Sequence, residues 1–251
     1  MPGWLEPLRQ ALDGADRPVP FFFRDDDVGW GDQRLWPLLE CFDAAGLPID
    51  LAVIPAAIEP QTALRLRDLI AASGGPLAAH QHGCTHANHE PQGRKHEFGP
   101  SRSARQQLDD LVRGRRLLAD ALGPKLVAPI FTPPWNRCTA TTGRCVARLG
   151  AFKVLSRDVT AAPLGVDLGG VIELPVTVDW FARRKGVRLD RWGVGELLGA
   201  SAAGGGPVGV MFHHEITDDR DLAAIDELLR LVAGHPAAAP APMLQVAGVA
   251  D

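Results

Sequence analysis

Histidine is concentrated in one short segment of this chain. Five of the eight histidines, His80, His82, His86, His89 and His96, lie within seventeen positions. His82 and His86 are four residues apart, a spacing that places two rings on one face of a helical turn and suits a single metal ion. His80 and His82 share one face of an extended strand, so that pairing is an alternative. This density favours a metal site over a set of surface or core histidines.

Three adjacent carboxylates follow an apolar run near the start of the chain. Arg24 is followed by Asp25, Asp26 and Asp27. Neighbouring carboxylates repel one another, so such a run costs stability unless a metal ion or an arginine neutralises it. A solvated turn that caps a helix explains the same run equally well. In the metal interpretation, Arg24 pairs with one carboxylate and the metal takes another.

One aspartate and two histidines form a set of three ligands that leaves coordination positions open, which is typical of catalytic metal sites. We expect one divalent transition metal, zinc in the first place, with cobalt, iron, nickel and manganese as alternatives. Such a metal shifts the pKa of a bound water towards neutrality. A second carboxylate can take the remaining proton of that water, and a histidine on the opposite rim can protonate a leaving group. These residue types indicate metal-assisted hydrolysis.

Two further clusters supply groups of the same kind. The segment Thr132–Asn136 has two prolines, which lack N–H groups, before Trp135. The amide of Trp135 is therefore held in a fixed direction and can serve an oxyanion, although a plain proline turn with a packing tryptophan explains the segment as well. His213 and His214 end an apolar run. Adjacent side chains of a strand point in opposite directions, so we expect His213 to face the site. In the alternative, both cap the strand and meet solvent.

The remaining candidates are weaker when each is taken alone. Asp179 is a candidate for orienting a catalytic histidine, and Trp180 for an apolar wall, but taken alone Asp179 is better explained as a strand-end carboxylate. His89 lies in a long segment, Ala87–Pro100, without clear periodicity, and such loops are often functional. The residues expected to contact substrate are Asp25, Pro134, Asn136, Trp180, His89 and His214.

Short apolar runs alternate with longer amphipathic ones along the chain. The expected strands are Val19–Arg24, Ile49–Ile54, Leu77–Gln81, Leu126–Phe131, Phe152–Leu155, one within Val171–Val178 that is broken or edged by Pro175, and Val208–Phe212. The expected helices are Gln33–Ala45, Gln61–Ala72, Ser101–Leu122, Thr139–Leu149, Val194–Ala202 and Asp219–Ala233. This alternation predicts a mainly parallel sheet covered by helices, and the number of units favours a barrel. The polar clusters follow expected strands, and active sites of such folds form at the carboxyl ends of the strands.

Length, composition and net charge limit the classes of protein to which the chain can belong. The 251 residues, 46% hydrophobic and 22% charged, suit one α/β domain over 1–251 and exclude a disordered or collagen-like chain. The net charge of −4 argues against a nucleic-acid partner. No membrane span and no signal segment are expected, so we predict a cytoplasmic protein with four reduced cysteines. The oligomeric state is not indicated. The tail 235–251 is expected to pack loosely, although Met243–Val249 can still dock.

In this order, the clusters resemble the motifs of the polysaccharide deacetylase family, the NodB-homology domain of carbohydrate esterase family 4. Arg24–Val28 resembles the family's first motif, T-F-D-D-G, and His82–His86 matches the second, H-[ST]-x-x-H. Thr132–Asn136 is similar to the third, R-x-P-[YFW]-G, and Val210–His213 to the last, L-x-H. The similarity covers about residues 19–215.

The resemblance implies a distorted (β/α)7 barrel and a role for each matching residue. It implies Asp26 as base, Asp27, His82 and His86 as metal ligands, the Trp135 amide as oxyanion donor, and His213 as general acid held by Asp179. A register shifted by one residue, with Asp25 and Asp26 as the pair, is the alternative.

The sequence departs from the family pattern at three places. Thr132 stands where the family has the arginine that pairs with the base, and Arg24 is the candidate replacement. Val28 follows the aspartate pair where glycine is usual, and Gly83 stands where serine or threonine is usual. These departures suggest a divergent branch. Together with the expected absence of a signal segment, they favour a sugar nucleotide, a lipid-linked precursor or another N-acylated small molecule, such as an amino sugar, over a polysaccharide as substrate. The alternatives are a catalytically silent barrel that binds carbohydrate or a partner, and a metal-dependent amidase or deformylase.

Overall fold

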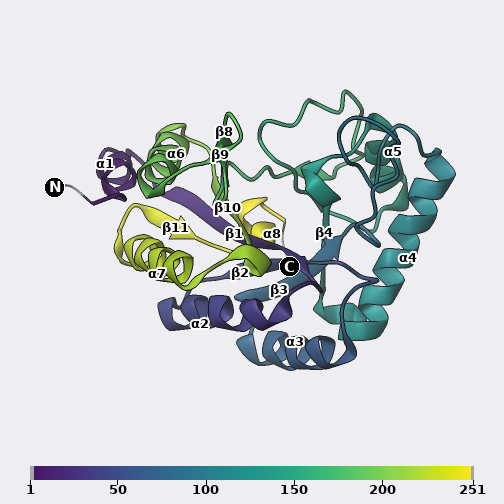
Figure 1. Cartoon of the computed structure of the whole chain (residues 1–251), viewed down its shortest axis with the longest axis horizontal. Coiled ribbons are helices and arrows are strands. Elements are labelled where there is room, and N and C mark those ends of the chain that lie inside the picture. Colours follow the sequence, from purple (N-terminus) through teal and green to yellow (C-terminus); the bar gives the residue numbers. More distant parts are fainter. Residues whose placement is uncertain (1–2, 250–251) are drawn as a thin grey trace.

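A curled sheet of parallel strands forms the centre of the molecule (Figure 1). The computed structural model describes residues 3–249. The strands are β1 (Val19–Val28), β2 (Ile49–Val53), β3 (Leu77–His82), β4 (Val127–Thr132), β5 (Val154–Leu155), β6 (Ile172–Glu173), β7 (Val178–Asp179), β8 (Arg183–Arg184), β9 (Val187–Arg188), β10 (Val208–His213) and β11 (Ala238–Pro240). The main sheet has the order β6-β5-β4-β3-β2-β1-β10-β7, and β11 pairs with β1. Because these pairs are all parallel, the carboxyl ends of the strands meet on one rim.

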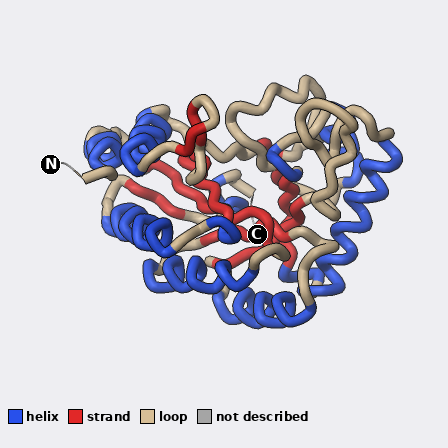
Figure 2. Tube along the Cα trace, in the orientation of Figure 1, coloured by secondary structure: helices blue, strands red, loops and turns tan. Residues whose placement is uncertain are grey.

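Helices cover the outside of this sheet (Figure 2). They are α1 (Glu6–Asp13), α2 (Leu35–Ala45), α3 (Pro60–Ser73), α4 (Ala104–Leu122), α5 (Ala140–Leu149), α6 (Arg191–Ala203) and α7 (Asp219–Gly234). The short helix α8 (Met243–Val246) instead packs against the interior core around Phe22. Neighbouring helices pack in the pairs α1 with α6, α2 with α7, α3 with α4, and α4 with α5. No helix in residues 3–249 is both long and apolar enough to cross a membrane. The mainly parallel sheet covered by helices, which the alternation predicted, is confirmed. The curled sheet also confirms the distorted (β/α)7 fold that the resemblance implied.

The two faces of β1 separate the barrel interior from the helix layer. Phe21 and Phe23 point outwards into the large apolar core under the helices. Phe22 points inwards and packs in a smaller core with residues of β4, β5 and β10. Side chains alternate along a strand, so Arg24 and Asp26 continue the inward face of Phe22.

The sheet does not close on itself. Strands β6 and β7 are the two ends of its order, and no pairing joins them in the described residues. The strand expected within Val171–Val178, broken or edged by Pro175, is confirmed as a broken one: β6 precedes Pro175 on one edge of the sheet, and β7 begins at Val178 on the other. Pro175 lies between them and lacks the N–H that a continuous ladder needs.

The C-terminal tail is packed, which corrects the loose tail expected from its composition. Strand β11 pairs with the start of β1, and Met243 at the start of α8 is fully buried. The backbone N–H of Met243 donates a hydrogen bond of 2.9 Å to Asp50 Oδ2 inside the barrel. The described part of the tail therefore packs against the sheet, which confirms the alternative expected for Met243–Val249. Residues 250–251 lie outside the described part.

Candidate active site

Three candidate metal ligands converge at the carboxyl-end rim of the sheet. Asp27 lies near the end of β1, His82 ends β3, and His86 lies in the loop that follows β3. Asp27 Oδ1 is 3.0 Å from His82 Nε2 and 3.1 Å from His86 Nε2. Ligand atoms of the three residues all lie within 4.8 Å of one another. One carboxylate and two imidazoles at this spacing fit a divalent transition metal and leave coordination positions open.

Local backbone strain places two of these ligands. Asp27 has a φ of 68° and His86 a φ of 56°, a left-handed conformation that is costly for residues other than glycine. Strict alternation would put Asp27 on the outward face with Asp25. The left-handed turn at Asp27 and the accompanying register shift between Asp25 and Val28 against β2 break that alternation. Asp27 therefore lies on the same side as Asp26, so the structure favours the Asp26–Asp27 register over Asp25–Asp26.

The surroundings of the two histidines fix their rings. His82 Nδ1 lies 3.1 Å from the carbonyl oxygen of Thr132, and a hydrogen bond donated there leaves Nε2 free to bind a metal. The His86 ring lies against two tryptophans, with centroid distances of 4.7 Å to Trp30 and 4.4 Å to Trp135. These contacts hold both imidazoles towards Asp27.

Glu97 organises the loop that carries His86, and sequence analysis did not assign it a role. Its fully buried carboxylate accepts hydrogen bonds from the backbone N–H groups of Cys84, Thr85 and His86, at 2.8 to 3.2 Å. A Cβ on Gly83 would lie 2.1 Å from Glu97 Oε2, so no serine or threonine fits there without rearrangement. The only sequence signal was its place in the long loop 87–100.

Asp26 and Arg24 form a buried ion pair. Arg24 donates from Nε to Asp26 Oδ1 at 2.7 Å and from Nη2 to Asp26 Oδ2 at 2.9 Å, and both side chains are at most 2% exposed. Burial raises the pKa of Asp26, but the charges of Arg24, His82 and His213 outweigh it and leave that pKa below its ordinary value. Arg24 therefore pairs with Asp26, as the sequence predicted of it as a candidate replacement.

Asp25 and His214 pair with each other on the outward side of the sheet. His214 Nδ1 is 2.6 Å from Asp25 Oδ2, and its backbone N–H donates to Asp25 Oδ1. Both residues are 0% exposed, so the substrate contacts expected from them are wrong. Despite burial, the charge and hydrogen bonds of Asp25 and Asp32 raise the pKa of His214 to about 10.

His213 faces the site, as expected from the alternation of side chains. Its Nε2 is 3.9 Å from Asp27 Oδ2, and its side chain is 27% exposed. The direct support expected from Asp179 is not made, because Asp179 Oδ1 accepts a hydrogen bond from the Phe181 N–H instead. In the described residues His213 Nδ1 is buried without a hydrogen-bond partner.

The other residues expected to contact substrate, Trp180, His89, Pro134 and Asn136, lie in different surroundings. Trp180 is fully buried and donates from Nε1 to Asp221, so it belongs to the core and forms no substrate wall. His89 is exposed on its loop and makes no side-chain hydrogen bond in the described residues. Pro134 packs against Gly83. Asn136 Oδ1 accepts a bond of 2.6 Å from Arg24 and lines a cleft beside the site.

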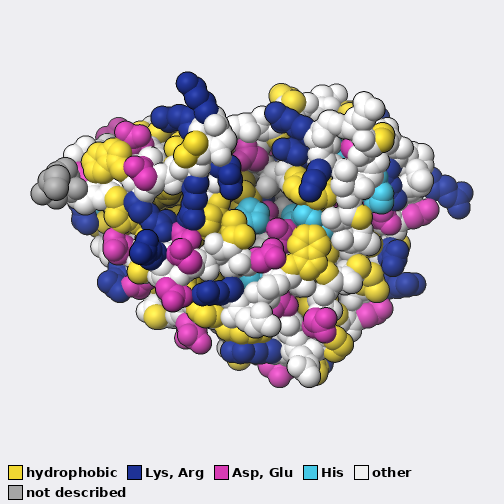
Figure 3. Space-filling view, viewed as in Figure 1, with side chains coloured by type: hydrophobic (Ala, Val, Ile, Leu, Met, Phe, Trp, Pro, Cys, Tyr) yellow, Lys and Arg dark blue, Asp and Glu magenta, His cyan; other side chains and the backbone are white. Residues whose placement is uncertain are grey.

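That cleft has a volume of about 490 Å³ and lies beside the site, because two of its lining residues contact site residues: the Trp135 ring lies 4.4 Å from that of His86, and Asn136 binds Arg24. Asp179 and Met211 also line it, whereas Asp27, His82 and His86 do not. Its other lining residues are Arg94, His96, Arg137, Cys138, Arg157, Asp158, Thr160, Ala161 and Ala162. Figure 3 shows histidine side chains gathered near the middle of this face.

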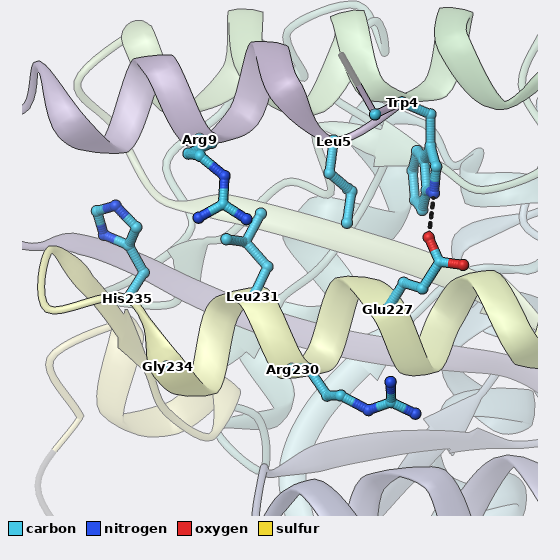
Figure 4. A pocket seen from close by; sticks show the side chains of 9 residues that line it. Trp4, Leu5, Arg9, Glu227, Arg230, Leu231, Gly234 and His235 are labelled. Atoms are coloured by element: carbon cyan, nitrogen blue, oxygen red, sulfur yellow. Dashed lines mark hydrogen bonds between the residues drawn. The ribbon is translucent and has the colours of Figure 1, made fainter. Parts of the chain in front are cut away.

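A second hollow, of about 470 Å³, lies between α1 and α7, where Trp4 donates to Glu227 (Figure 4). None of the three candidate ligands lines it.

Solved structures with a similar fold are carbohydrate esterases of family 4. No family model matches the chain, and no curated protein is significantly similar in sequence. A Mycobacterium smegmatis protein assigned to the polysaccharide deacetylases has 19% identity and a TM-score of 0.68, with 94% of this chain and 91% of that one covered. A family 4 acetyl xylan esterase from Clostridium thermocellum, in complex with cobalt, has 12% identity and a TM-score of 0.58, with 90% and 89% covered.

A catalytically silent relative has the same fold. A pseudoenzyme of carbohydrate esterase family 4 from Bacillus anthracis has 13% identity and a TM-score of 0.57, with 93% of this chain and 66% of that one covered. The chain therefore has the fold of the NodB-type domain of polysaccharide deacetylases and family 4 carbohydrate esterases.

Proposed function

We propose that this protein is a metal-dependent hydrolase that removes an N-acyl group, in the first place N-acetyl, from an amino sugar or a related small molecule. The observation that carries the proposal is the convergence of Asp27, His82 and His86 beside the Arg24–Asp26 pair. Asp26 comes from the same strand as Asp27, and His213 from the neighbouring strand β10.

The ligand set fits a divalent cation on the chemistry of its donors. A cation bound by Asp27, His82 and His86 supplies Lewis acidity for the acyl carbonyl and for water. Asp26, kept ionised by Arg24, accepts the proton of the attacking water. The Trp135 amide donates to the oxyanion. His213, on the neighbouring strand β10, donates the proton that the departing nitrogen needs.

A catalytically silent binding protein is the second candidate, favoured by the pseudoenzyme neighbour. The two candidates differ in turnover and not in fold. In the silent protein the cleft binds a saccharide or a partner, while the Asp26–His213 pair performs no proton transfer.

The first test is the metal content of purified wild-type protein and of a His82→Ala/His86→Ala variant, measured by elemental analysis. We expect about one equivalent of a transition metal in the wild type and a loss of it in the double variant. His235→Ala is the matched control, because His235 pairs with Asp13 away from the site.

Acetate release from N-acetylated sugars then separates the candidates. Release by the wild type that disappears in Asp26→Asn supports the hydrolase. Bound metal without turnover of any N-acyl compound supports the silent protein, and absence of metal even after reconstitution contradicts the metal site itself.

A further inference from the structure

The cleft beside the candidate ligands has a cationic wall. Arg94 comes from the loop after β3 and Arg137 from the loop after β4, and both line the cleft. In residues 3–249 neither guanidinium has a carboxylate within 4.0 Å. Arg157, the third arginine of the cleft, is neutralised by Glu173. The cleft therefore holds two guanidinium charges without a counter-ion.

These two arginines lie close enough to repel each other. Partial burial, and after it the charge of Arg94, lowers the pKa of Arg137. The Arg137 side chain is held there by a hydrogen bond to the carbonyl oxygen of Lys95, and Lys95 Nζ lies 5.9 Å from the Trp135 ring centroid. Like charges that are brought together without a partner are stabilised by a bound anion.

The carboxylates of the cleft form a separate group. Asp179 lies at the end of β7, and Asp158 is engaged by the backbone N–H of Thr160 at 2.7 Å. Asp179 accepts a hydrogen bond from the backbone N–H of Phe181, and in the described residues neither carboxylate forms an ion pair with Arg94 or Arg137. The two carboxylates therefore leave both guanidinium groups available to an anionic group of a ligand.

A second group of basic residues lies on the β8–β9 hairpin, near His213. Hairpin β8–β9 carries Arg183, Arg184 and Lys185, and it follows Phe181, whose ring centroid is 6.3 Å from that of His213. Figure 3 shows Lys and Arg side chains on either side of the central histidines. The hairpin residues do not line the cleft, but in a chain of net charge −4 basic side chains on this face favour the approach of anions.

We infer that the substrate is a small N-acylated molecule with an anionic group, a phosphate or a carboxylate, which Arg94 and Arg137 bind while the acyl group lies over Asp27, His82 and His86. This inference rests on the proposed function. A volume of about 490 Å³ is in the range of small-molecule sites. Guanidinium groups bind both phosphate and carboxylate in the same bidentate geometry, so the anion's identity is part of the test.

Binding to metal-free protein tests the inference without turnover. Calorimetric titrations use N-acetylglucosamine 6-phosphate, the carboxylate-bearing N-acetylmuramic acid and neutral N-acetylglucosamine as probes, after metal removal so that no probe binds through a cation. We expect at least one anionic probe to bind the wild type about tenfold or more tightly than the neutral probe. Arg94→Ala and Arg137→Ala should each remove most of that difference and leave the neutral probe unchanged. Arg105→Ala, an exposed arginine on α4, is the matched control.

The outcomes separate the inference from the proposed function. Equal affinity for neutral and anionic probes, or an equal loss in Arg105→Ala, overturns the inference. If the metal-loaded enzyme still releases acetate from neutral sugars, the proposed function survives that result. Charge-dependent binding that is lost in the arginine variants supports the anion site, and absence of acetate release from every probe then contradicts only the hydrolase. Tighter binding of the phosphate or of the carboxylate probe decides which anion the site prefers.

Discussion

At the residue scale, the chemistry depends on how buried charges are paired. Arg24 is fully buried and donates to Asp26, Asn136 and Ser156. A buried charge is stable only when such partners compensate for the lost hydration. Arg24 therefore both stabilises the barrel interior and keeps Asp26 ionised.

Replacing Arg24 should affect both stability and pH dependence. We expect Arg24→Met to lower the free energy of unfolding by about 3–5 kcal/mol, because Asp26 is left buried without its partner. The pKa of Asp26 is depressed in the folded protein, so its contribution to stability is lost as the pH falls through that pKa. Without Arg24 the pKa of Asp26 should rise. The fall in stability on acidification, and the acid limb of the kcat/KM profile, should therefore both move to higher pH. Urea unfolding and a pH–rate profile measure the two effects.

Arg34 is the control for this substitution. Its ion pair with Asp219 is exposed on both sides, so Arg34→Met should cost less than about 1 kcal/mol. Similar losses in the two variants would contradict the role of the buried pair.

Glu97 is the second residue that merits a substitution. We expect Glu97→Gln to lower metal affinity by about 10- to 100-fold. The amide keeps one uncharged acceptor oxygen but places its NH2 group against N–H donors that now bind the second carboxylate oxygen, so the position of His86 is less well held. Activity at saturating metal should change less than the metal Kd. Glu90→Gln is the matched control, since Glu90 lies in the same loop and binds Ser101. An unchanged metal Kd in Glu97→Gln would disprove the positioning role.

At the scale of elements, β1 connects the parts of the molecule. Its outward side chains pack under the helices, its inward side carries the Arg24–Asp26 pair, and its left-handed residue Asp27 turns towards the site. The short helix α8 belongs to the same interior, because its first N–H donates to Asp50 on β2. Burial raises the pKa of Asp50 to about 7.

The docking of α8 should therefore depend on pH through Asp50. A carboxyl whose pKa is raised on folding stabilises the protein most below its unfolded pKa, and this stabilisation is lost as the pH rises through about 7. We expect Asp50→Asn to be the more stable protein above pH 7. The difference should grow by at most about 1.4 kcal/mol per pH unit between pH 4 and 7. Urea unfolding at several pH values measures it, and exposed Asp68 provides the control variant Asp68→Asn. A pH-independent difference would rule out this titration.

At the scale of the whole molecule, the site exists only when the barrel is folded. Its three candidate ligands come from β1, β3 and the loop after β3, and His213 comes from β10, which lies beside β1 although it is remote in sequence. A metal that binds only this folded arrangement stabilises the folded state by mass action.

Metal removal should therefore lower the Tm. At a free metal concentration of 100 times the Kd, the stabilisation is about 2.7 kcal/mol, and a chelator should abolish it. The His82→Ala/His86→Ala variant should show no metal-dependent change in Tm. A chelator-insensitive Tm in wild-type protein that has been shown to contain metal would contradict the coupling of the site to folding.

Local sequence patterns were sufficient for the elements and for the chemical groups. Apolar periodicity identified most strands and helices, and the position of polar clusters after strands identified the rim. The sequence missed α1, hairpin β8–β9, β11 and α8, because short elements are stabilised by packing more than by their own pattern. It also placed Trp180 and Asp25 at the site, since a position near a strand end does not tell which side a side chain takes.

The amino-acid sequence by itself determined which residues are available for a metal, a base and an acid, and the strand order in the chain that delivers them to one rim. Only the tertiary structure decided that Asp27, and not Asp25, joins Asp26, because the left-handed backbone at Asp27 breaks the alternation. It also decided that Arg24 pairs with Asp26 and that Glu97 holds the loop of His86. These contacts depend on the three-dimensional positions of neighbouring groups, which local sequence periodicity does not encode.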